Sequence, residues 1–350
     1  MGNFTSLERV RKVIAGQPVD HLPVQPVLMM FAAKHAGIPY IDYTRDGRKM
    51  AEAQIKVAED FGIDCLLTCS DPAREVIDIA GEGSVVWFED QGPAINEGRA
   101  ALTEKRRLKE FRLPDPCGGG RMHDRIKAIE IMRRAVGQEV SIVGWIEGPL
   151  ALAQELRGLN NVMADFVDDP EFVHDLLDFT AEVAMLYALP QIAAGADTIG
   201  MSDAAASMIG PSRYAEFLFP RQLRVLDFVK EKHHEVIRRL HMCGKTDPLI
   251  PKMRELPVDI YELDFPVNLA AARAGLGPER VISGNISTIT DLLEGTPETV
   301  YGAARKCHET CGQFHIVNSG CEVSPLTPPD NLRAMVQYAR DYRPDGSRAA

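Results

Sequence analysis

The sequence lacks an excess of basic residues, and this absence narrows the classes of protein that it can encode. Lys and Arg total 39 against 50 Asp and Glu, which gives the 350-residue chain a formal net charge of −11. A nucleic-acid-binding surface needs a basic face, so we expect no nucleic-acid partner. The hydrophobic fraction of 45% and the charged fraction of 25% are those of a folded globular protein.

Long apolar runs are also absent. A membrane-spanning helix needs roughly 18 or more consecutive, mostly apolar residues. The longest apolar region, 183–196, is interrupted by Pro190 and Gln191. The sequence therefore predicts no membrane association.

The beginning of the sequence has no signal-peptide core. It has instead a capping-box pattern from Thr5 to Glu8, which predicts a helix that continues through Ile14. The seven cysteines are an odd number in a large chain, which is typical of a reducing compartment where cysteines are buried, catalytic or metal-bound. We therefore expect a cytoplasmic protein.

The main pattern that is present is an alternation of short β-branched runs with longer segments of helical period. A parallel sheet closed as a (β/α)8 TIM barrel accounts for this alternation. An open doubly wound sheet is the main competitor, but no Gly-x-Gly-x-x-Gly motif stands at a strand-to-helix turn. The eight predicted strands are 23–29, 63–70, 141–146, 197–202, 236–242, 259–264, 281–285 and 314–319.

The segment 84–116 departs from this repeat and predicts an inserted hairpin, with apolar runs on both sides of a turn at 91–93. No linker divides the chain, so we expect one barrel domain over 1–350, with a polar, frayed tail over 344–350. The predicted helices include 47–61, 123–136, 171–193, 211–232, 289–293 and 297–310.

Polar residues follow many of the predicted strands. The carboxyl ends of the strands carry the chemistry in a (β/α)8 barrel, so these residues are candidates for a functional site. Helix capping is the competing interpretation, notably for Asp71 and Asn285. The residues are Asp71, Glu147, Asp203, His241, Cys243, Asp264, Asn285 and Cys321.

His241 and Cys243 are the most specific pair among them. Residues i and i+2 of an extended chain point to the same side, so the imidazole and the thiol converge just past a strand end. Both are good zinc ligands. A buried histidine beside an inert cysteine is the alternative.

Cys321 strengthens the metal interpretation, because it follows the last predicted strand and a glycine, on the same face of the barrel as His241. A His, Cys, Cys trio leaves one position of a tetrahedral zinc ion open, as a catalytic zinc requires. Glu147 is the first candidate for that fourth position and Asp203 is the second. The other cysteines are expected to have packing or surface roles: Cys65, Cys69, Cys117, Cys307 and Cys311.

These residues and their surroundings resemble the uroporphyrinogen decarboxylase-like superfamily. The resemblance extends over nearly the whole chain, most firmly after about residue 140, and it implies a (β/α)8 barrel. It rests on the segments 144–153, 195–197, 209–211, 214–220, 282–285, 293–298, 320–321 and 327–331, together with Asp203.

Within that superfamily, His241, Cys243 and Cys321 look like the zinc-binding signature of the corrinoid-dependent methyltransferases. The resemblance implies that these three residues bind zinc and that a separate corrinoid protein is a partner. The decarboxylase branch resembles a different pattern, in which an arginine-rich stretch after the first strand holds the substrate carboxylates. Here the stretch 27–35 contains no arginine.

Three functions stay open at this point. In the first, zinc activates a substrate for methyl transfer to or from cobalt. The activated atom is either the oxygen of a methyl ether, expected to be aromatic, or the sulfur of a thiol, and the ether is slightly favoured. The second is a metal-independent decarboxylase, with Asp71 or Asp203 at its centre. The third is a non-catalytic scaffold with structural cysteines. A homodimer is compatible with each of them.

Overall fold

The computed structural model describes residues 4–342, so the predicted frayed tail over 344–350 lies outside the described residues. The first helix, α1 (Ser6–Ile14), begins with the predicted capping box. The Glu8 amide donates to Thr5 Oγ1 at 3.2 Å, and the Thr5 amide donates back to the Glu8 carboxylate at 2.9 Å. The prediction of this helix from four residues of sequence is confirmed.

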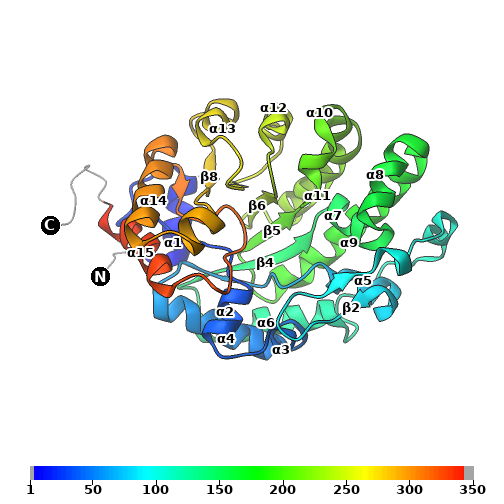
Figure 1. Ribbon diagram of the computed structural model, residues 1–350, viewed down its shortest axis with the longest axis horizontal. Helices are drawn as coiled ribbons and strands as arrows, with labels where there is room; N and C mark the ends of the chain where they lie inside the picture. The colour runs from blue at the N-terminus through cyan, green and yellow to red at the C-terminus, as the bar shows by residue number, and fades with distance from the viewer. Residues whose placement is uncertain (1–3, 343–350) are drawn as a thin grey trace.

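The central sheet has seven parallel strands in the order β1-β4-β5-β6-β7-β8-β9, and each strand pairs with the next. The ribbon shows the sheet curling, with helices packed around its outer face (Figure 1). All seven strands lie within predicted runs, extended by one residue at Glu147. They are β1 (Cys65–Leu67), β4 (Ser141–Glu147), β5 (Thr198–Ser202), β6 (Ile237–Met242), β7 (Ile260–Leu263), β8 (Val281–Ser283) and β9 (His315–Ile316).

The eighth position of the barrel is taken by residues 23–27. On one side, the Gln25 amide donates to the Val317 carbonyl at 3.0 Å, beyond the end of β9. On the other side, the Asp64 amide donates to the Val24 carbonyl at 2.8 Å, just before β1. This segment joins the two ends of the sheet, which confirms the (β/α)8 architecture. Only isolated bridges form here, at Val24 and Val27, so the predicted strand over 23–29 is shorter and less regular than expected.

The helices follow the strands in the predicted alternation. The predicted helix over 47–61 is reproduced residue for residue as α4. The others are α2 (Met30–His35), α3 (Tyr40–Arg45), α5 (Ala73–Ala80), α6 (Arg121–Val136), α7 (Pro149–Arg157), α8 (Leu159–Asp168), α9 (Pro170–Ala193), α10 (Gly210–Arg213), α11 (Phe219–Lys232), α12 (Ile250–Met253), α13 (Leu269–Leu276), α14 (Pro297–Cys311) and α15 (Pro329–Asp341), with α4 at Gly47–Phe61.

Helix α9 is the one helix in the described range that is long and apolar enough to cross a membrane. It packs against α7, α11 and β4, and half of its most apolar window is buried. These contacts are those of a core helix in the outer layer of the barrel.

The predicted hairpin is present between α5 and α6. Strands β2 (Val85–Val86) and β3 (Ala94–Ile95) pair antiparallel. Because α6 begins at Arg121, whose guanidinium binds Asp71 just past β1, the insertion leaves and rejoins the barrel at the carboxyl ends of the strands. The insertion therefore belongs to the same end of the barrel as the candidate site.

The amino-terminal end of the barrel is closed by α1. Its apolar side chains form one buried cluster with residues at the start of strands β6 to β9. We call the opposite, carboxyl end of the barrel the mouth. The cluster contains Leu7, Val10, Val13, Val19, Ile237, Ile260, Val281 and Ile316.

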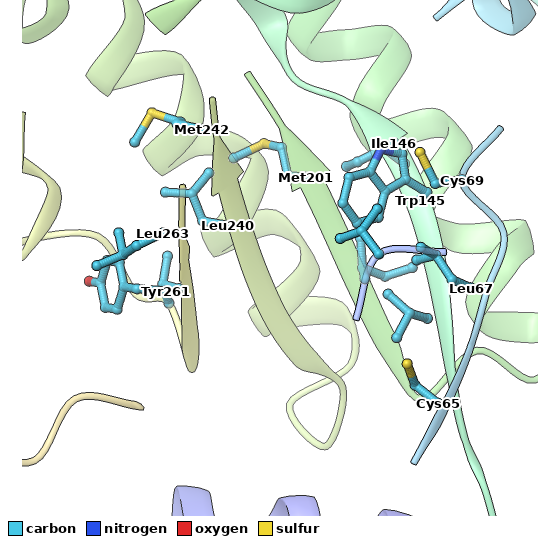
Figure 2. Close-up of a cluster of buried hydrophobic side chains, with 14 of the residues drawn as sticks. Cys65, Leu67, Cys69, Trp145, Ile146, Met201, Leu240, Met242, Tyr261 and Leu263 are labelled. Atoms are coloured by element: carbon cyan, nitrogen blue, oxygen red, sulfur yellow. The ribbon is translucent and has the colours of Figure 1, made fainter. Parts of the chain in front are cut away.

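Alternate strand residues face the barrel interior and the helices. A Cβ atom at Gly200 would lie 2.6 Å from the Trp145 indole, so these two positions of β5 and β4 share the interior face. Met242 lies on the other face, with its sulfur 3.7 Å from Gln222 of α11. Figure 2 shows Cys65 in β1 and Cys69 just past its end, with Cys69 beside Trp145. Both cysteines are buried, as the sequence predicts.

Candidate metal and active site

A ring of polar residues lines the interior at the mouth. The strand register places Glu147 beside Ser202, Ser202 beside His241, and His241 beside Glu262. All four side chains are buried. Since neighbouring strands lie about 4.8 Å apart, this register brings residues from four separate segments to one level of the barrel.

Three of the predicted residues converge at this level. His241 Nε2 lies 3.2 Å from Cys243 Sγ and 3.9 Å from Cys321 Sγ, and the two sulfur atoms lie 3.9 Å apart. All three ligand atoms lie within 4.8 Å of one another. The i, i+2 spacing at the end of β6 thus meets the cysteine that follows β9, as the sequence predicts.

These separations suit a metal ion. Zinc with tetrahedral bonds of about 2.3 Å to sulfur and 2.0 Å to nitrogen places its ligand atoms roughly 3.5–3.8 Å apart. A disulfide needs about 2.05 Å between sulfurs, and both cysteines are free thiols here. One imidazole and two thiols form a donor set suited to zinc, with one position left for another ligand.

The imidazole of His241 faces the carboxylate of Glu262 on the neighbouring strand. Its Nδ1 is buried without a hydrogen-bond partner and lies 3.8 Å from the Glu262 carboxylate. Glu262 accepts from Arg239 Nε at 2.5 Å and from Asn318 Nδ2 at 3.0 Å. A carboxylate on this side of the ring favours a proton on Nδ1, which leaves Nε2 free to bind a metal.

The electrostatics of the cluster favour one ionised thiol. The hydrogen bond between the thiols of Cys243 and Cys321 lowers the pKa of Cys321 and raises the pKa of Cys243. Burial would lower the pKa of His241, but the Glu262 carboxylate and Cys321 outweigh burial and raise it. A bound metal ion requires both thiols to be ionised and the imidazole to be neutral.

Glu147 lies in the same interior layer but outside the group formed by His241, Cys243 and Cys321. Its carboxylate accepts from Arg74 Nη2 at 3.2 Å, and the same nitrogen lies 3.4 Å from Glu75 of α5. Burial, with the nearby Glu75 carboxylate, raises the pKa of Glu147 well above its usual range. The carboxylates of Glu75 and Glu147 thus share the Arg74 guanidinium, and Glu147 is hydrogen-bonded to Arg74.

Asp203 serves the backbone in this structure. One of its oxygens accepts from the amides of Leu150 and Ala151 at 2.8 and 3.0 Å, at the beginning of α7. The other oxygen accepts from Gln222 Nε2 at 2.7 Å. The side chain is fully buried, so these contacts occupy it as a helix cap.

Asp71 is paired with Arg121 through two hydrogen bonds of 2.7 and 2.8 Å, and it caps the Ala73 amide at 3.1 Å. Burial would raise the pKa of Asp71, but Arg121 outweighs burial and lowers the pKa to about 2. The structure therefore satisfies the helix-cap interpretation of Asp71.

Sequence reasoning misses several residues of this region. Glu262 and Arg239 share the interior parity of His241, so strict alternation along β6 and β7 could identify them. Arg74 and Glu75 lie on α5, and no spacing in the sequence relates them to β4. Trp145 lies with its ring centroid 6.3 Å from that of His241, and it appears as core in any apolar pattern.

The fold and the site together define a class: a (β/α)8 barrel with a His-Cys-Cys group at its carboxyl mouth that could hold a metal ion. The chain belongs to the uroporphyrinogen decarboxylase (URO-D) family, whose model matches residues 5–342. The resemblance inferred from the sequence is confirmed.

The relatives divide between two activities. The chain is 28% identical to methylcobamide:CoM methyltransferase MtbA of Methanosarcina mazei, over 98% of this chain and 100% of that protein. It is 26% identical to methylcobamide:CoM methyltransferase MtaA of Methanosarcina barkeri, over 98% and 99% of the two chains. A uroporphyrinogen decarboxylase of Synechococcus sp. is 34% identical, but over only 60% of each chain.

A solved structure shares the fold. The methyltransferase from Methanosarcina mazei superimposes with a TM-score of 0.81 at 23% identity, covering 97% of this chain and 99% of that chain. Of the curated relatives named above, the two methyltransferases match over nearly their full length, whereas the decarboxylase matches over part of its length.

Proposed function

We propose that this chain is a zinc-dependent methyltransferase that moves a methyl group between the cobalt of a separate corrinoid protein and a small thiol. His241, Cys243 and Cys321 would hold the zinc ion. The observation that carries the proposal is their convergence within 4.8 Å at the open end of the barrel. The full-length similarity to methylcobamide:CoM methyltransferases supports the corrinoid partner and the thiol.

Zinc, when bound, supplies a Lewis acid that lowers the pKa of a coordinated thiol. The chain itself orients and shields that site. Glu262, held by Arg239 and Asn318, faces Nδ1 of His241 and keeps Nε2 available. Trp145 fills the interior over Gly200 beside the imidazole and excludes water from that side of the metal site.

The proposed substrate differs from the slight preference for a methyl ether that the sequence suggests. That preference places Glu147 at the open position of the metal. In the structure Arg74 binds Glu147, and the full-length relatives are named for a thiol coenzyme or a methylated thiol. A thiol is therefore the substrate class that we propose, with action in the cytoplasm, where all seven free cysteines would stay reduced.

The decarboxylase alternative gains nothing from the structure. The start of α2, where the decarboxylase pattern carries arginines, presents the Met30 amide to the Glu322 carboxylate at 3.0 Å. Substrate carboxylates would need guanidinium partners, and Glu322, whose pKa burial raises to about 7, supplies none.

The test measures methyl transfer by the purified, zinc-loaded chain, which the absorbance change of free cobalamin reports. Methylcobalamin is the methyl donor for a thiol, and reduced cobalamin is the methyl acceptor for an ether. A simple alkanethiol and methoxybenzene, a methyl ether to be demethylated by reduced cobalamin, form the two substrate arms. We expect turnover with the thiol and none with the ether.

Cys243→Ala and Cys321→Ala should lose activity by at least 100-fold, and Cys117→Ala, at an exposed free thiol, is the matched control. Turnover confined to the ether would refute the thiol assignment. Full activity of the Cys243→Ala variant would refute the role of the metal group.

A further inference from the structure

Exposed large apolar side chains are confined to one end of the barrel. Among the described residues, every such side chain lies in a segment that follows the carboxyl end of a strand and precedes the helix that returns the chain. The return loops at the opposite end carry none of them within 4–342. The seven residues are Phe88, Leu113, Val167, Met208, Phe265, Ile289 and Leu326.

Two of these residues flank the metal-ligating group. A Cβ atom at Gly320 would lie 2.3 Å from the backbone nitrogen of Phe265, so Phe265 adjoins the residue next to Cys321. A Cβ atom at Gly244 would lie 2.7 Å from Ser207 Oγ, so Met208 is one residue from a contact with the neighbour of Cys243. Met208 is 60% exposed and Phe265 is 40% exposed.

Two further residues extend this surface around the mouth. Ile289 is 44% exposed and follows Ile286, whose carbonyl accepts from the Gly320 amide. Leu326 is 67% exposed and lies five residues beyond Cys321. We call Met208, Phe265, Ile289 and Leu326 the apolar rim.

A concave apolar site adjoins the rim at Leu326. A cavity of 410 Å³ lies between α2, the inserted hairpin and the segment after β9. A cavity of this size accepts a large side chain of a partner, as anchor pockets of protein interfaces do. Its lining includes Met30, Ala33, Ile38, Pro39, Tyr40 and Leu326.

Lysine side chains lie at two points of this surface. Lys34 and Asp90 both line the cavity, and Lys245 follows Cys243 by two residues. Neither lysine forms an ion pair with any residue in the described range, although the net charge of the chain is −11. Because Asp90 offsets Lys34 at the cavity, Lys245 is the cation that favours a carboxylate of a partner beside the apolar contact.

We propose that the apolar rim and its cavity are the docking surface for the corrinoid-carrying protein, which seats an apolar patch over the mouth and places a carboxylate near Lys245. This inference rests on the proposed function. The cobalt must come within reach of a substrate bound at the zinc site of His241, Cys243 and Cys321, so its carrier has to cover the surface next to these residues. An exposed apolar surface confined to that end meets this requirement.

The experiment compares two methyl donors with the zinc-loaded chain. One is free methylcobalamin, and the other is a purified methylcorrinoid-carrying protein that the wild-type chain demethylates. Leu326→Asp and Met208→Asp replace exposed side chains, so we expect both variants to fold normally. His234→Asp, whose side chain is 93% exposed in the loop before β6, is the matched control at the opposite end.

We expect the rim variants to lose at least tenfold in kcat/KM with the protein-bound donor and less than twofold with free methylcobalamin. The control variant should change neither. Equal losses with both donors, or no loss with either, would overturn the docking assignment. A change in the oligomeric state of the isolated rim variants by analytical ultracentrifugation would overturn it in favour of self-association. Failure of the wild type with free methylcobalamin would overturn the proposed function itself, and the docking assignment with it.

Discussion

Replacing Asp203 by alanine should destabilise the protein without removing its metal site. The change removes the acceptor for two amides at the start of α7, Leu150 and Ala151, and for Gln222 Nε2, all in a fully buried place. Each buried donor left without a partner costs about 1–3 kcal/mol, and water that enters the space left by the carboxylate reduces the sum. We expect a total loss of about 3–5 kcal/mol in the free energy of unfolding.

The Asp203→Asn variant is the matched control. Asparagine keeps one oxygen for the two backbone amides but presents an NH2 group to Gln222. Turning the Gln222 amide would sacrifice the hydrogen bond of 2.7 Å that its oxygen accepts from Tyr214. We expect an intermediate loss of about 1–3 kcal/mol, the cost of one unsatisfied buried donor.

Urea unfolding at pH 7 measures these losses, and metal analysis of the folded variants shows whether the metal site survives. Both variants should bind zinc as the wild type does. At a temperature where they are folded, their turnover should stay within about tenfold of the wild-type value, which allows for small shifts of the bound substrate. A loss of less than about 1 kcal/mol for the alanine variant would refute the capping role. A stable, zinc-loaded Asp203→Asn variant with turnover reduced by more than 100-fold would show that Asp203 acts in the chemistry.

Two shorter predictions concern other parts of the mouth. Arg121 lowers the pKa of Asp71 to about 2 in the folded protein. The ionised Asp71 therefore stabilises the fold above its unfolded pKa of about 3.9, and this stabilisation is lost as the pH falls toward 2. Asp71→Asn should therefore cost about 2–3 kcal/mol at pH 6, and denaturant midpoints should show this cost shrinking toward pH 3; a constant cost would contradict the pairing. Gly320→Ala places a Cβ atom 2.3 Å from the Phe265 nitrogen, whereas Gly302 has open space around it. Titration with a competing chelator should show zinc binding that is at least tenfold weaker for Gly320→Ala and unchanged for Gly302→Ala. Equal affinities of the two variants would contradict the close contact.

The fold is largely readable from the sequence because its signals are local. A capping box defines α1, and the helix α4 is bounded by Asp46, which accepts from the Arg48 amide, and by Gly62 with φ of 73°. The ligand group is readable for a similar reason, since an i, i+2 pair at one strand end needs only one further cysteine on the same face.

The surroundings of the site are not readable because they depend on contacts between distant connections. Glu147 appears in the sequence as a free carboxylate at a strand end, yet α5 brings Arg74 against it across 73 positions of the chain. Asp203 appears as a strand-end acid, yet the loop that contains it lies against the beginning of α7. In both cases a buried carboxylate acquires donors that only the packed barrel supplies.

The most direct test of the proposed function is zinc K-edge X-ray absorption of the purified chain with and without a thiol. About one zinc ion per chain should be bound by one nitrogen and two sulfur ligands, in line with the convergence of His241, Cys243 and Cys321. Adding the thiol should raise the sulfur count by about one, because the open position of a catalytic zinc accepts the substrate. A metal-free chain with full methyl-transfer activity, or a zinc spectrum unchanged by the thiol, would contradict the account.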